Sequence, residues 1–218
     1  MTDPQIRVLV ADDHAAIRAG MRLMLEQAPD IAVVGEAADG AVAVRQATAL
    51  RPDVVLMDIR MPGTDGISAT RAITSARLAD VLILTTFDFD DYLFGALRAG
   101  AAGFLLKSVE PASLIDAIRR VAAGDGFLAP EVTRRLLTAF VSVGPAPATP
   151  PTRTFDSLTE RERDVLAALG RGLSNAGLAA SLAISEATAK THVSRVLAKL
   201  GCTSRVQAAI LAKEAGLS

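Results

Sequence analysis

The first half of the chain alternates short apolar runs with amphipathic stretches. Apolar runs of strand length are each followed by a segment whose apolar residues recur at helical spacing. This alternation is typical of a parallel sheet with helices on both faces. The predicted strands span 7–11, 32–36, 54–58, 81–85 and 103–106. The predicted helices span about 15–27, 41–50, 67–75, 91–99 and 112–123, with Gly100 and Gly124 as C-terminal caps.

The second half predicts helices alone, after a connecting segment. Residues 130–140 predict one helix with a proline in its first turn, and the proline-rich residues 144–152 predict a semi-rigid linker. Four further helices are expected, the third ending at Leu200 before Gly201. Their expected N-terminal caps are Thr159, Ser174, Ser185 and Ser204, of which the first and last form capping boxes with Glu162 and Gln207.

These patterns predict an α/β domain over residues 1–125, a linker over 126–152 and an all-α domain over 153–218. Composition agrees with two compact units, because half of the 218 residues are apolar. Charge divides unevenly: 14 basic and 18 acidic residues lie up to Ser142, and 9 basic and 6 acidic residues follow it. The excess of positive charge in the second half is a weak indication of an anionic partner.

Two absences bear on location. Cys202 is the single cysteine, which excludes an intrachain disulfide and favours a reducing compartment. The N-terminal residues lack the pattern of a signal peptide, and the sequence has no uncharged apolar stretch of membrane-spanning length. We therefore expect a cytoplasmic protein with no membrane partner.

Charged and hydroxyl side chains stand at the ends of four predicted strands. Asp58 ends the third strand, Asp12 and Asp13 follow the first, Thr85 ends the fourth and Lys107 follows the fifth. The carboxyl ends of parallel strands meet at one edge, where α/β sheets bind ligands. Crowded carboxylates repel one another, so the sequence predicts a hard divalent cation, Mg²⁺, at this edge.

The same constellation suits phosphoryl transfer to a carboxylate. Lys107 and the Thr85 hydroxyl can neutralise charge on phosphoryl oxygens while Asp58 attacks in line. Taken singly, Asp12 or Asp13 is more often a helix cap, Lys107 a solvated lysine and Thr85 a strand residue. His14 is expected in a surface or capping role, because an oxygen-rich site prefers hard cations. The joint placement favours Asp58 as a phosphoacceptor.

The third helix of the second half has an apolar stripe opposite a polar face. Together with the shorter helix before it, it fits a helix-turn-helix that enters a major groove. We expect base contacts from Lys190, Thr191 and Ser194, and phosphate contacts from His192, Arg195, Lys199 and Arg205. The alternative is the solvated face of an ordinary helical bundle.

Several motifs resemble one protein family. The acidic pair at 12–13, DIRMPGTDG from Asp58, ILTTF around Thr85 and GAAGFLLK ending in Lys107 resemble the receiver domain of two-component response regulators. LTERERDVLAALGRGLSNAGL and SEATAKTHVSRVLAKLG resemble the LuxR-type DNA-binding domain. Across nearly its full length the chain is similar to the NarL/FixJ family, which implies a five-stranded flavodoxin-like receiver and a four-helix helix-turn-helix domain.

The resemblance also implies roles for single residues. Asp58 would be phosphorylated by a sensor histidine kinase, with Mg²⁺ bound by Asp13, Asp58 and the Arg60 carbonyl. Asp12 would bind that ion through water. Thr85 and Phe104 would form a switch in which the aromatic ring moves inward; Phe104 has no hydroxyl, so the switch is expected to be a change of packing.

The resemblance further implies that the last helix pairs two copies of the chain on a pseudo-palindromic DNA site. The residues concerned are Val206, Ala209, Ile210 and Lys213, which could equally be ordinary core. Homodimerisation on phosphorylation is the corresponding expectation.

The predicted function is thus a phosphorylation-controlled transcription regulator, a binding protein rather than an enzyme. One alternative is a metal-dependent phosphatase or phosphotransferase with an aspartyl-phosphate intermediate, although the sequence lacks a second catalytic acid and a substrate-pocket motif. Another is a regulator that works without phosphorylation, which the presence of all five receiver residues disfavours.

Overall fold

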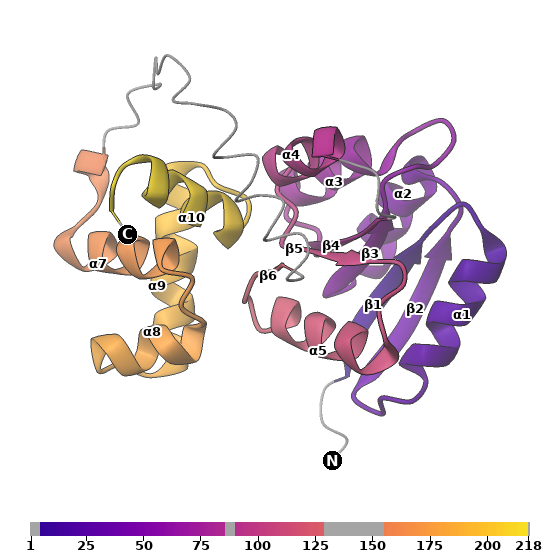
Figure 1. Ribbon diagram of the computed structural model, residues 1–218, viewed down its shortest axis with the longest axis horizontal. Helices are drawn as coiled ribbons and strands as arrows, with labels where there is room; N and C mark the ends of the chain where they lie inside the picture. Colours follow the sequence, from indigo (N-terminus) through magenta and orange to yellow (C-terminus); the bar gives the residue numbers. More distant parts are fainter. Residues whose placement is uncertain (1–4, 86–89, 129–154, 218) are drawn as a thin grey trace. The chain divides into compact units, whose positions relative to one another are not determined.

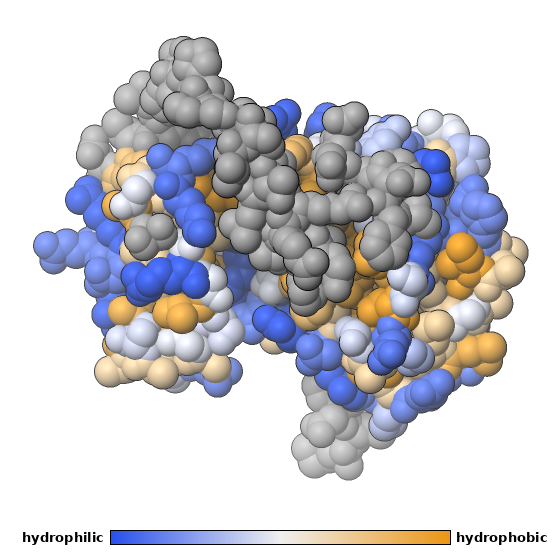
Figure 2. Space-filling model, viewed as in Figure 1, coloured by the Kyte–Doolittle hydropathy of each residue, from blue (hydrophilic) through white to orange (hydrophobic). Residues whose placement is uncertain are grey.

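The computed structural model describes residues 5–85, 90–128 and 155–217, and the chain divides into two compact units, Met1–Phe127 and Leu128–Ser218. Each unit is considered by itself (Figure 1). The helix predicted at 130–140 and the linker predicted at 144–152 lie outside the described residues. Figure 2 shows hydrophilic and hydrophobic residues interspersed over the visible face of each unit. Within the described ranges, no helix has the length and apolar character needed to cross a membrane.

The first unit is built on a twisted sheet of strand order β2-β1-β3-β4-β5-β6. The pairs β1/β2, β1/β3, β3/β4 and β4/β5 are parallel, as predicted. The strands are β1 Ile6–Ala11, β2 Ile31–Ala37, β3 Val54–Asp58, β4 Asp80–Thr85, β5 Gly103–Leu106 and β6 Phe127–Leu128. The prediction of five strands was wrong by one: β6 has two residues, too few to show a period, and the Phe127 N–H donates to the Ala102 carbonyl at 3.1 Å.

Helices cover both faces of this sheet. On one side α1 packs against α5, and on the other α2, α3 and α4 follow one another (Figure 1). Their bounds are α1 Ala15–Leu25, α2 Gly40–Leu50, α3 Gly66–Ser75, α4 Asp90–Arg98 and α5 Pro111–Ala122. Because both faces are covered, every residue of β3 is buried, Asp58 included. The chain order reverses around β1 and β3, so the carboxyl ends of these two strands flank the switch point of the sheet.

The second unit is helical and has its own apolar core. It contains the 3₁₀ turn η1 Phe155–Ser157 and helices α7 Glu160–Gly170, α8 Asn175–Leu182, α9 Glu186–Leu200 and α10 Arg205–Glu214. The four predicted N-terminal caps all accept a backbone N–H, and the Thr159 box is complete. The second box was only half right: Gln207 Oε1 accepts from the N–H and hydroxyl of Thr203 instead of Ser204.

Candidate functional site

One lysine lies between two buried acids at the carboxyl edge of the sheet. Lys107 Nζ is 2.7 Å from Asp12 Oδ2 and 2.9 Å from Asp58 Oδ2. Asp12 is fully buried, Asp58 is 5% exposed and the Lys107 side chain is 13% exposed. Three of the predicted site residues, contributed by the ends of β1, β3 and β5, are therefore in direct contact.

The backbone of neighbouring strands holds this arrangement. The Lys107 N–H donates to the Thr85 carbonyl at 2.8 Å, which fastens the end of β5 to the end of β4. Asp12 serves in two ways, because its Oδ1 accepts the His14 N–H at 2.9 Å while its Oδ2 faces Lys107. The Asp12 carbonyl accepts from Arg18 at 2.7 Å, and Arg18 also pairs with Glu36 of β2. Sequence reasoning missed Arg18 and Glu36, since isolated charges on a helix and a strand carry no motif.

The acidic edge is short of positive charge. Burial raises the pKa of Asp58, the nearby Asp12 charge adds to this, and Lys107 only partly opposes it. Asp12 Oδ2 is buried, and the Lys107 ammonium at 2.7 Å is the positive charge that compensates it. A cluster of oxygen donors that is incompletely neutralised fits a hard divalent cation such as Mg²⁺.

Asp13 and His14 border this edge on its exposed side. Ligand atoms of Asp12, Asp13 and His14 lie within 4.8 Å of one another. His14 Nδ1 is 2.6 Å from Asp13 Oδ1, and the imidazole is 67% exposed. The surface position agrees with the role expected for His14.

Of the remaining predicted receiver residues, Thr85 and Arg60 lie near the same edge and Phe104 lies inside the sheet. Thr85 is half-buried at the end of β4, and Arg60 is exposed two residues after Asp58. Phe104 is fully buried and pairs in register with Ile83. The inward movement implied for Phe104 would thus begin from a ring that is already interior. The Arg60 carbonyl as a metal ligand stays a prediction.

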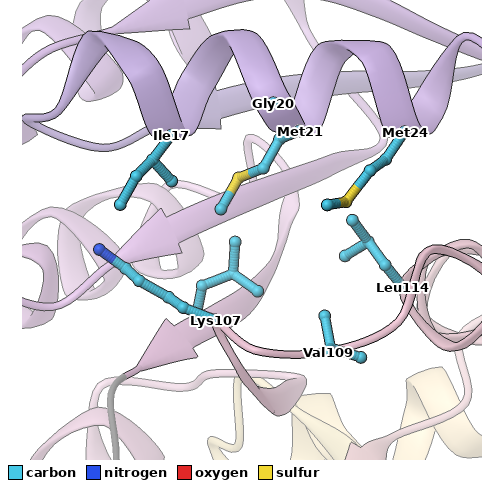
Figure 3. Close-up of a pocket in the computed structure, with 8 residues that line it drawn as sticks. Ile17, Gly20, Met21, Met24, Lys107, Val109 and Leu114 are labelled. Atoms are coloured by element: carbon cyan, nitrogen blue, oxygen red, sulfur yellow. The ribbon is translucent and has the colours of Figure 1, made fainter.

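A cavity of about 200 Å³ lies beside the stem of Lys107 (Figure 3). Apolar groups from α1 and from the β5–α5 segment dominate its walls. The lining residues are Ile17, Gly20, Met21, Met24, Leu84, Lys107, Val109 and Leu114. The aliphatic part of Lys107 therefore runs along apolar surface while its ammonium reaches the acids.

In the second unit, α9 buries one face and exposes the other. Ala189, Val193, Val196 and Leu200 are buried in the core. The exposed residues include Lys190, Thr191, Ser194 and Arg195, as the predicted groove-facing side requires. The Thr191 hydroxyl donates back to the Ala187 carbonyl at 2.9 Å.

Three residues predicted to contact phosphates are engaged or enclosed within the domain. Lys199 Nζ lies 2.6 Å from Glu162 Oε2, and Arg205 donates to the Leu173 carbonyl at 2.6 Å and to Asn175 Oδ1 at 3.2 Å. His192 is half-buried, and its Nδ1 is enclosed with no hydrogen-bond partner among the described residues. Arg195 and Lys199 are both exposed, but only Arg195 lies on the predicted groove-facing side without a polar contact inside the domain among the described residues.

The last helix presents two different stripes. Ala208 and Ala212 belong to the domain core, and Leu211 packs against it. Of the predicted dimer residues, Ala209 and Ile210 are half-buried and Lys213 is exposed, whereas Val206 is buried.

The Glu162–Lys199 pair predicts a pH dependence of the second unit. The Lys199 hydrogen bond is the main cause that lowers the pKa of Glu162 from 4.5 to about 2. A carboxyl whose pKa is lowered by folding adds stability above its unfolded pKa and loses it as the pH falls through its folded pKa. We expect hydrogen exchange of the α7 and α9 amides to accelerate in wild type relative to Glu162→Gln as the pH falls from 4.5 to 2. A difference that stayed constant over this interval would contradict the pairing.

Comparison with known proteins agrees with this geometry. Residues 8–119 match the response regulator receiver domain, and residues 156–212 match the bacterial regulatory proteins of the luxR family. The transcriptional regulatory protein LiaR of Bacillus subtilis is 41% identical over 209 residues, covering 95% of this chain and 96% of LiaR. The nitrate/nitrite response regulator NarL of Escherichia coli is 36% identical over 204 residues, covering 93% of each chain.

A solved structure spans both units. The crystal structure of the response regulator ChrA, from a heme-sensing two-component system, is 42% identical and covers 99% of this chain and all of ChrA, with a TM-score of 0.56. None of these matches supports the alternative of a phosphatase or phosphotransferase. The chain belongs to the NarL/FixJ family of two-component response regulators, which are DNA-binding transcription regulators.

Proposed function

We propose that Asp58 accepts a phosphoryl group from a sensor histidine kinase and that this event controls DNA binding by the second unit. The observation that carries the proposal is the Lys107 ammonium shared between Asp12 and Asp58, both buried, at the carboxyl edge of the sheet. A buried carboxylate that shares its ammonium with a second acid is only partly neutralised and can attack an electrophilic phosphorus. The ammonium can then stabilise the phosphoryl oxygens.

In the proposed reaction an Asp58 oxygen forms a bond to phosphorus while the bond from phosphorus to the kinase histidine nitrogen breaks. Lys107 turns from the Asp58 carboxylate to a phosphoryl oxygen, and the Thr85 hydroxyl donates to another. Asp13, Asp58 and the Arg60 carbonyl would hold Mg²⁺ directly, with Asp12 acting through water. When bound, that ion neutralises charge on the phosphoryl oxygens.

The structural change caused by phosphorylation would be transmitted from the site through β4 and β5. The Lys107 N–H is bonded to the Thr85 carbonyl, so a movement of either residue is felt by the other. Phe104 lies on β5, three residues before Lys107, and its buried ring can only move if its neighbours repack. We infer that phosphorylation acts on the rest of the receiver through this packing.

The output is proposed to be major-groove binding by α9 in a homodimer. Lys190, Thr191 and Ser194 would meet base edges and Arg195 a phosphate, because these residues are exposed on the polar face of α9. The accessible residues of α10, Ala209, Ile210 and Lys213, would pair two copies on a pseudo-palindromic duplex, with the buried Val206 supporting them. The proposed site of action, with a kinase and chromosomal DNA as partners, is the cytoplasm.

The proposal is tested with the wild-type chain, acetyl phosphate and Mg²⁺. We expect one phosphoryl group per chain by intact-mass measurement, and tighter binding, at fixed salt, to a duplex selected from a randomised pool. Chelation of Mg²⁺ should prevent the uptake. Continuous turnover of a generic phosphate ester would instead favour an enzyme, and uptake with no change in DNA affinity would contradict the proposed control.

A further inference from the structure

One side chain fastens the last turn of α9 to the beginning of the DNA-binding domain. Lys199 Nζ donates to Glu162 Oε2 at 2.6 Å and to the Ser157 carbonyl at 2.9 Å. An ammonium has three N–H donors, so two of them are used within the domain. The two acceptors belong to the first turn of α7 and to η1, 37 and 42 residues earlier in the chain.

The acceptor is itself held in place. Glu162 Oε2 also accepts the Thr159 N–H at 2.8 Å and the Thr159 hydroxyl at 3.0 Å, and its side chain is 7% exposed. The capping box therefore orients the Glu162 carboxylate independently of its contact with Lys199. The partner of α9 is a rigid point at the start of α7, and not a mobile surface acid.

Apolar packing and the Lys199 hydrogen bonds constrain α9 in different ways. The buried stripe that includes Val193 and Val196 is held by the hydrophobic effect, which has no direction, whereas a charge-assisted hydrogen bond is directional. Lys199 is nine residues beyond Lys190, about 13 Å along the helix axis. A rotation of α9 at its last turn is carried through the rigid helix to the residues that face the groove.

We propose that Lys199 is a positioning residue for DNA recognition and not a phosphate contact. Through Glu162 it fixes the rotation and the axial position of α9. This replaces the role predicted for Lys199 from the sequence, and it rests on the proposed groove-facing side of α9. The adjacent carboxylate cancels most of the field that Lys199 would offer to a phosphate. Base discrimination should therefore depend on the pair, whereas the number of neutralised phosphates should not.

The test compares Lys199→Met, Glu162→Gln and the double variant with wild type in the full chain. Methionine keeps the length of the stem without its charge, and glutamine at the third helical position still completes a capping box, so both domains should fold. The probes are a duplex selected by wild type from a randomised pool and a mixed-sequence duplex of equal length. Affinity for both is measured over a series of salt concentrations, and circular dichroism checks the helix content.

A positioning role predicts that each single variant loses about tenfold in the ratio of selected to mixed affinity, and that the double variant loses no more. The slope of log affinity against log salt should stay at the wild-type value. A phosphate contact predicts that Lys199→Met lowers this slope by about 0.9 and weakens both duplexes alike. It also predicts that Glu162→Gln, which removes an acid, tightens binding to both duplexes. The two roles thus predict changes of opposite sign in the affinity of Glu162→Gln for the selected duplex: a loss if Lys199 is a positioning residue, and a gain if it is a phosphate contact.

Arg195→Met is the matched control on the same helix, since Arg195 is exposed on the proposed groove side. This variant should lower the salt slope by about 0.9. If Lys199→Met loses helix content, the sign of the Glu162→Gln effect decides the question by itself. If wild type does not distinguish selected from mixed DNA, the groove-facing assignment fails, and the inference about Lys199 falls with it.

Discussion

Asp58→Asn is expected to abolish phosphoryl uptake from acetyl phosphate and Mg²⁺, measured as the complete loss of the added mass on the intact chain. The amide that replaces the carboxylate is a poor nucleophile and cannot form the acyl phosphate. The fold should survive, because burial raises the pKa of Asp58 and therefore disfavours its charged form in the folded protein. We expect a melting temperature at or above that of wild type, so that the loss of uptake is not a loss of structure.

Asp65→Asn is the matched control for this substitution. Asp65 caps α3, where its side chain accepts the Ser68 N–H at 2.7 Å, and asparagine caps a helix as well as aspartate does. The control should take up phosphate and bind DNA as wild type does. Phosphoryl uptake by Asp58→Asn at the wild-type rate would place the acceptor elsewhere and overturn the assignment.

The sequence predicted the elements that have a local apolar pattern, either a continuous run or a helical spacing, and missed the short strand that has none. The predicted strands at 54–58 and 103–106 have the observed bounds, because each is a continuous apolar run closed by a charged residue. The predicted helix 15–27 ends two residues earlier, at Leu25, since nothing in its apolar spacing marks the last turn. Strand β6 escaped prediction because its pairing depends on β5, and not on its own two residues.

For the site, the sequence identified residues but not their partners. Asp12, Asp58 and Lys107 were predicted to converge, since strand ends of a parallel sheet share an edge, and their contacts agree. The internal partner of Lys199 could not be predicted, because Glu162 already had a sufficient explanation in its capping box. Contacts between elements distant in the chain depend on the packing of the helices, which has no local signal.

Gly66→Ala is expected to destabilise the first unit by about 3 kcal/mol or more and to slow phosphoryl uptake by about tenfold to a hundredfold. A Cβ at residue 66 would lie 1.9 Å from the Asp58 carbonyl oxygen and 2.9 Å from the Ile59 Cα. These are backbone atoms, so no side chain can turn away to relieve the clash. The Gly66 N–H is bonded to the Ile59 carbonyl at 2.9 Å, which prevents α3 from simply moving outward.

The strain therefore passes to Asp58 itself, and the distance from its carboxylate to Lys107 must change. Gly20→Ala is the control with the same added methyl, because a Cβ at residue 20 meets nothing within 4 Å and alanine favours the interior of α1 by about 0.5 to 1 kcal/mol. Urea unfolding and the rate of phosphoryl uptake measure both variants. If Gly66→Ala matched Gly20→Ala in both measurements, the close approach of α3 to the end of β3 would be wrong. The clash in Gly66→Ala is with the backbone of the phosphoacceptor itself, so its stability and its rate of phosphoryl uptake should fall together. Neither quantity should fall in Gly20→Ala.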